Sequence, residues 1–110
     1  MAKLVLDALR AGYQLVVHGK GGFREIIITN GSGWPDYVFD SSYKLMSLND
    51  LELFIAKNGH LPDISSAKDI DSNSGYNLHT NNVQLLKKIE ELTLYIIALN
   101  KEIDLLKKLK

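Results

Sequence analysis

Apolar residues repeat at heptad spacing along residues 81–110, a stretch without glycine or proline. From residue 85 to residue 106 the spacing alternates between four and three, which predicts one long helix with Thr80 as its N-cap. Isoleucine fills each a position from Ile89 onward, leucine fills each d position, and the polar Asn82 takes the a position before them. At 1.5 Å per residue this helix is roughly 45 Å long, too long for the rest of the chain to cover its apolar stripe. We therefore expect a self-associating coiled coil, with an interface formed by Leu85, Ile89, Leu92, Ile96, Leu99, Ile103 and Leu106.

The number of helices in this coiled coil is left open by the heptad pattern. Isoleucine at a with leucine at d favours a parallel dimer. The flanking positions are unusually apolar, however, with Leu86 at e and Tyr95 and Leu109 at g. A wider apolar face favours more strands, because each helix then contacts two neighbours. These outer residues could equally receive a helix from the middle of the chain.

Two β-rich runs, residues 13–18 and 23–29, lie on either side of the glycine-rich residues 19–22. This arrangement predicts an N-terminal β-hairpin. Both runs carry apolar residues on both faces, and a lone two-stranded hairpin is only marginally stable in water. We expect the hairpins of several copies to bury one another, with Val17 and Ile27 between chains.

Local capping signals predict short helices in the middle of the chain. Ser47 precedes an apolar stripe at helical spacing and Gly59 ends it, so we expect a helix over about residues 48–57. A helical turn is expected near residues 66–71, capped by Ser65 or Ser66. The whole is an α+β fold in three segments that form one intertwined unit. These are a hairpin segment at 1–33, an aromatic linker with short helices at 34–80, and a coiled coil at 81–110.

An aromatic cluster lies just before the first central helix, and it consists of Trp34, Tyr37, Phe39 and Tyr43. Such a cluster can act as a hydrophobic plug that joins the hairpin to the helices, or as a platform on which sugar rings stack. We favour the plug and retain the platform as the alternative.

Composition narrows the chemistry that the chain can perform. Its 110 residues include 13 basic and 13 acidic residues, and this balance argues against nucleic-acid binding. The chain has no cysteine, and no apolar run approaches the roughly 18–20 residues of a membrane span. The histidines, His18, His60 and His79, do not have metal-ligand spacing, and no pair of aspartates is singled out by its spacing. We therefore expect no catalytic site, metal site or cofactor.

Several stretches resemble the C-terminal region of tail-fibre-like proteins of Bacteroidetes and their phages. The resemblance begins at residue 12 with GYQLVVHGK and continues through WPDYVF at 34–39, YKLMSL at 43–48, HLPDI at 60–64 and LLKKIEELTLY at 85–95. Two features depart from the pattern. Ser65 replaces a usual proline, and the loop at 71–76 differs. The resemblance implies a trimeric fibre end without enzyme activity, in which residues 81–110 form a parallel trimeric coiled coil and the hairpins of residues 1–33 wind into a short β-stem.

The expected function is a structural, non-enzymatic homotrimeric tip of a tail fibre or surface adhesin. It would drive the trimerisation of an upstream fibre shaft and fix the register of its chains. It would also attach to a host-surface glycan or receptor. Its location would be extracellular or on a virion or phage-like particle. One alternative is an autoproteolytic chaperone tip, whose Ser-Lys type site residues 40–44 resemble only loosely. A second is a glycan-binding tip that uses Trp34 and Tyr37. A cytosolic coiled-coil adaptor is disfavoured, because it gives the hairpin and the aromatic cluster no purpose.

Overall fold

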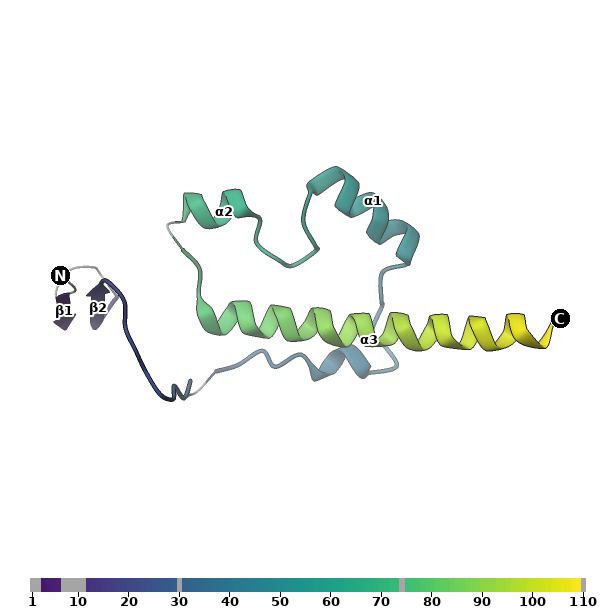
Figure 1. Cartoon of the computed structure of the whole chain (residues 1–110), viewed down its shortest axis with the longest axis horizontal. Coiled ribbons are helices and arrows are strands. Elements are labelled where there is room, and N and C mark those ends of the chain that lie inside the picture. Colours follow the sequence, from purple (N-terminus) through teal and green to yellow (C-terminus); the bar gives the residue numbers. More distant parts are fainter. Residues whose placement is uncertain (1–2, 7–11, 30, 74, 110) are drawn as a thin grey trace.

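The computed structural model describes residues 3–6, 12–29, 31–73 and 75–109. This part of the chain is mostly helical and elongated, with extents of 68 × 30 × 26 Å (Figure 1). Its elements in chain order are strands β1 (Lys3–Leu6) and β2 (Leu15–His18), the 3₁₀ helix η1 (Asp36–Phe39), and helices α1 (Leu48–Asn58), α2 (Ala67–Ser72) and α3 (Leu78–Lys108).

The 31-residue helix α3 is the longest element of the described chain. The prediction of one long C-terminal helix is confirmed, but the predicted cap is wrong. The helix is capped by Asn77, whose Oδ1 accepts from the backbone N–H of Thr80 at 2.9 Å. An asparagine at the N-cap satisfies an N–H group of the first turn, so the helix starts earlier than the heptads indicate. The structure holds one copy of the chain, and the coiled-coil pairing of α3 stays a prediction.

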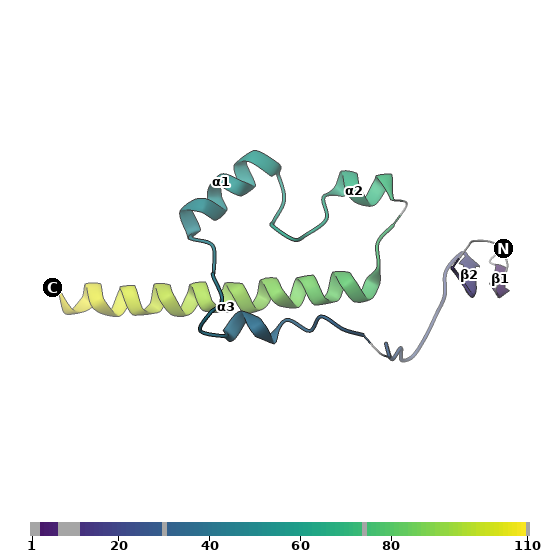
Figure 2. The ribbon, with the colours of Figure 1, turned by 180° about the vertical axis from the view of Figure 1, so that it is seen from behind.

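Helices α1 and α2 lie where the capping signals place them. Ser47 Oγ accepts from the N–H of Asp50 at 3.1 Å, and Gly59 ends α1 in the left-handed conformation with φ 74°. Ser66 and Asp69 form a capping box at the start of α2. Figures 1 and 2, seen from opposite sides, both show α1 and α2 arched over one side of α3, with η1 along another.

The predicted hairpin is wrong in its second strand. Strand β2 pairs antiparallel with β1, so that Val17 lies opposite Leu4, and residues 23–29 form no regular strand. Ile27 is 82% exposed in this chain. A run that is apolar on both faces has nothing in one copy to bury either face, and pairing between distant segments is not specified by local composition. In place of the predicted hairpin stem of residues 1–33, the described residues of this range form a two-stranded sheet followed by the irregular residues 23–29.

The core of the described residues lies between η1 and α3. Pro35 and Val38 are fully buried there, and Val83 of α3 is buried as well. A 3₁₀ helix has three residues per turn, so Pro35 and Val38 point to the same side and pack on α3.

A second contact fixes the segment before η1 to the start of α3. A ring nitrogen of His79 donates to the carbonyl oxygen of Ser32 at 3.0 Å. A Cβ at position 31 would come within 2.5 Å of the His79 ring, so only glycine allows this approach.

Candidate functional site

The seven predicted interface residues of α3 form an open apolar stripe, which we call the seam: Leu85, Ile89, Leu92, Ile96, Leu99, Ile103 and Leu106. Each is between 44% and 65% exposed. Heptad spacing on a continuous helix places them along one side of α3. A contiguous apolar stripe of this kind is rare on the surface of a protein that acts as a monomer.

The chain covers α3 on sides other than the seam. Val83 and Glu90 at b and Lys88 at g are buried, and the side chains of Lys87 at f and Glu91 at c are largely covered. Segment 34–46 and the turn at 61–65 provide the cover, and the a and d positions stay free. The single chain thus packs around α3 in a way that leaves the seam available.

One polar cluster holds the turn after α1 against α3. Asp63 Oδ2 lies 2.8 Å from Lys87 Nζ and 3.4 Å from Lys88 Nζ, and Lys88 Nζ donates to Glu91 Oε1 at 2.8 Å. The hydrogen bond from Lys87 holds the pKa of the Asp63 carboxyl below its usual range. Asp63 also has a positive φ of 66°, unusual for a residue with a side chain. We call this cluster the Asp63 pillar.

Two tyrosine hydroxyls fix the segment between η1 and α1. Tyr43 donates to Glu91 Oε2, and Tyr95 donates to the carbonyl oxygen of Met46 at 2.6 Å. Burial, together with the hydrogen bond to the Glu91 carboxylate, raises the pKa of Tyr43 to about 12. Burial also raises the pKa of Tyr95. Tyr95, expected to widen the apolar face, therefore holds the chain's own linker through its hydroxyl.

Glu90 is a buried carboxylate at the η1 side of α3. Its Oε1 is buried without a hydrogen-bond partner among the described residues. Burial, with a smaller contribution from the nearby charge of Asp36, raises the pKa of Glu90. Protonation of Glu90 would remove the cost of burying its charge. The heptad pattern did not indicate this burial, because it places Glu90 at a b position, away from the coiled-coil interface.

Three of the four residues of the aromatic cluster point outward from η1. Pro35 and Val38 face α3, while Trp34 is 62% exposed and Tyr37 and Phe39 are also exposed. The Tyr37 ring lies 5.9 Å from the Tyr43 ring, measured between centroids, and Lys87 Nζ lies 5.8 Å from the Tyr37 centroid. Within one chain, the contacts expected of an aromatic plug are thus made by a proline and a valine.

The two stem residues predicted at the interface are not brought to the seam. Val17 and Ile27 are both exposed, and the β1–β2 sheet lies beyond the N-terminal end of α3 in both views (Figures 1 and 2). Their predicted contact with other copies remains a prediction.

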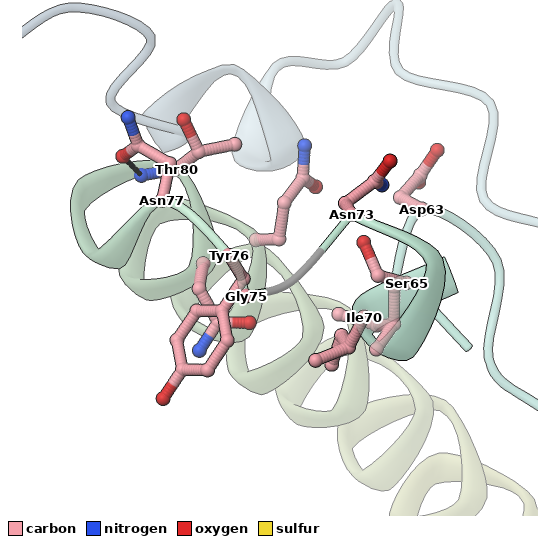
Figure 3. Close-up of a pocket in the computed structure, with 11 residues that line it drawn as sticks. Asp63, Ser65, Ile70, Asn73, Gly75, Tyr76, Asn77 and Thr80 are labelled. Carbon is pink, nitrogen blue, oxygen red and sulfur yellow. Dashed lines mark hydrogen bonds between the residues drawn. The ribbon is translucent and has the colours of Figure 1, made fainter. Parts of the chain in front are cut away.

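Two hollows lie beneath the arch formed by α1, α2 and the turn between them. One is polar, with a volume of about 310 Å³. In Figure 3 it lies between α2 and the first turns of α3, and its lining includes Asp63, Ser65, Asn73, Asn77 and Gln84. The Gln84 Oε1 is buried there and has no hydrogen-bond partner in the described part of the chain.

The other hollow is largely apolar, with a volume of about 280 Å³. We call it the apolar hollow. It lies between α1 and α3, and its lining includes Met46, Leu51, Leu61, Pro62, Leu92 and Tyr95. Both hollows share Asp63, so the Asp63 pillar stands between them.

The residues with metal-binding or catalytic chemistry are dispersed. His60 bonds to the Leu61 carbonyl oxygen and His79 to that of Ser32, far from His18 in the sheet. In the described ranges, no three histidine or acidic side chains converge to hold a metal ion. The helices of these ranges are too short or too polar to span a lipid bilayer.

Sequence reasoning missed the Asp63 pillar, the Asn77 cap and both hollows. The spacing of Asn73, Asn77 and Asn81 was a visible signal for the polar hollow, since the last two lie one helical turn apart. Comparisons with protein-family models, curated proteins and solved structures found no match.

Proposed function

We propose that this chain is a structural, non-enzymatic module that assembles as a homotrimer and forms the tip of a fibre or surface adhesin. The observation that carries the proposal is the open seam of α3. The chain covers other sides of this helix with its own residues, yet leaves the seven seam residues 44–65% exposed. A second and third copy of the same helix would bury them by knobs-into-holes packing.

The apolar surface beyond the seam supports three strands over two. Ile97 at b and Leu109 at g are exposed as well, so the apolar face of the C-terminal half of α3 is broader than an a/d stripe. In a dimer these flanks would stay in water. In a trimer each helix contacts two neighbours, and a wider face becomes buried.

The exposed isoleucines of residues 23–29 support a role for several copies in the stem. Ile26, Ile27 and Ile28 are all exposed in one chain, although their composition is typical of a strand. Alignment of three copies by α3 would place these runs side by side. The fibre setting, the upstream shaft and an extracellular or virion location rest on the resemblance of five sequence stretches to tail-fibre-like proteins.

The mass of the chain in solution tests the proposal directly. Sedimentation equilibrium should give three times the chain mass of 12.3 kDa, over a range of loading concentrations. A dimer would retain the coiled coil and refute the trimeric tip. A monomer at concentrations well above micromolar would refute the whole proposal.

A glycan-binding tip is a second candidate, because Trp34 and Tyr37 are both exposed and lie three residues apart at η1. Aromatic faces open to solvent can stack on sugar rings. A sugar-array signal that disappears in Trp34→Ala would support this candidate, and a signal unchanged by that substitution would refute it.

A further inference from the structure

Helix α1 is amphipathic but has no buried residue in the single chain. At 100° per residue, Leu48, Leu51, Phe54 and Ile55 lie within about 120° of one another, and Leu53 lies on the other side of the helix. Leu48 and Ile55 remain exposed. An isolated helix of 11 residues is marginal in water, so its apolar face needs a packing surface.

Its own α3 does not provide that surface. In the described part of the chain, α3 packs closely against η1 and does not contact α1 in this way. The apolar hollow lies between the two helices instead, with Leu51 on one wall and Leu92 and Tyr95 on the other. Tyr43, Tyr95 and the Asp63 pillar fix the segments before and after α1 to α3, while α1 itself makes no close contact with α3 between these attachments.

The apolar hollow is continuous with the seam. Leu92 is both a d residue of the seam and a lining residue of the hollow, while Lys88 and Tyr95 line it from g positions. In a parallel coiled coil, the g positions of one helix lie beside the e positions of the next. A neighbouring helix that covers the seam on this flank would therefore lie at the opening of the apolar hollow, next to α1.

We propose that α1 of each copy packs across the seam onto α3 of the adjacent copy. Leu51 and Ile55 would then close the apolar hollow against the e and b side of that helix, which carries Thr93 and Ile97. This also assigns a role to Ile97, an exposed isoleucine at a b position that neither the seam nor its own chain covers. The occupant of the hollow is thus a second copy of this chain.

The inference rests on the proposed self-association, and α1 offers a matched pair of variants that separates the two. Ile55→Lys places a charge on the apolar face, and Leu53→Lys places the same charge on the other side of the same helix. Ile55→Lys should raise the protein concentration at which half of the chains are trimeric at least tenfold, while Leu53→Lys should change this concentration less than twofold. Equal, small effects of both variants, in a protein that remains trimeric, would overturn the inference and leave the proposed function standing.

Disulfide trapping gives a second measurement that does not depend on stability. The chain has no cysteine, so single variants Ile55→Cys and Ile97→Cys can be mixed in denaturant, refolded together and oxidised. A disulfide that joins one chain of each variant is expected, and the matched mixture of Leu53→Cys with Ile97→Cys should give much less. Trimers that form without the first disulfide, or with equal yields in both mixtures, would refute the contact.

Discussion

Ile96→Asp separates the properties of one chain from those of the assembly. Ile96 lies at an a position near the middle of the seam and is 65% exposed in the single chain. If the chain acted alone, the substitution would be a surface change worth about 0.5 kcal/mol or less. In the proposed trimer, one carboxylate per chain would enter a shared apolar core. Burial of unpaired like charges costs several kcal/mol, so the trimer should dissociate at pH 7.

The pH dependence of this variant has a definite sign. Burial and mutual repulsion would raise the pKa of the introduced carboxyls in the trimer above the unfolded value of about 3.9. The destabilisation is then largest above the raised pKa and lessens as the pH falls through it. The assembled form has the higher carboxyl pKa, so it binds protons more tightly than the unfolded chain and is favoured in acid. Sedimentation and thermal melts at pH 7 and at about pH 4 should show partial recovery of the trimer in acid.

Leu53→Asp is the matched control, because Leu53 is 66% exposed in the single chain, almost the same as Ile96. It lies on α1 away from both the seam and the apolar hollow. The control should remain trimeric with a nearly unchanged melting temperature. If Ile96→Asp behaves like this control at pH 7, the heptad assignment is incorrect and the coiled coil is refuted.

The other predictions concern the packing, the Asp63 pillar and the order of assembly. Val38→Ala should lower the free energy of unfolding by about 2 kcal/mol, because Val38 is fully buried. Trp34→Ala should lower it by less than about 1 kcal/mol if Trp34 is as exposed in the assembly as in the single chain. A larger loss, measured by urea unfolding, would indicate that Trp34 is part of the hydrophobic plug. Asp63 has a lowered pKa in the fold, so it stabilises the protein above its unfolded pKa and this contribution is lost as the pH falls through the folded pKa. Asp63→Asn, which keeps a residue tolerant of positive φ, should lower stability at pH 7 and flatten its decline in acid; an unchanged urea midpoint at pH 7 would contradict the pillar. Deletion of residues 81–110 should leave a monomeric or aggregated chain, and fusion to a foreign trimeric coiled coil should restore assembly, because association of the helices raises the effective concentration of the stem to about millimolar. A stable trimer of the truncated chain, seen by sedimentation, would show that the stem carries the assembly.

The sequence by itself determined the helices, because their signals are local. Ser47, Ser66 and Gly59 act on backbone groups within four residues of themselves, and the structure has Ser47 and Gly59 in their predicted roles and Ser66 as the cap from the predicted pair Ser65 and Ser66. The heptad repeat likewise predicted one long C-terminal helix, since its period is read along a single element. The cap was missed because Asn77 and Thr80 are both acceptable cap residues, and only the backbone path before the helix selects between them.

The tertiary structure decided the contacts between segments distant in the sequence. Strand β2 pairs with residues 3–6 and not with 23–29, a choice between two strand partners that composition does not make. The Asp63 pillar joins residues more than twenty positions apart, and Tyr95 reaches Met46 across a similar fold-back of the chain. At η1, the three-residue turn placed Pro35 and Val38 inward in place of the larger aromatics. Such pairings depend on how the chain returns upon itself, and that path is set by the sum of many weak contacts and not by any one local pattern.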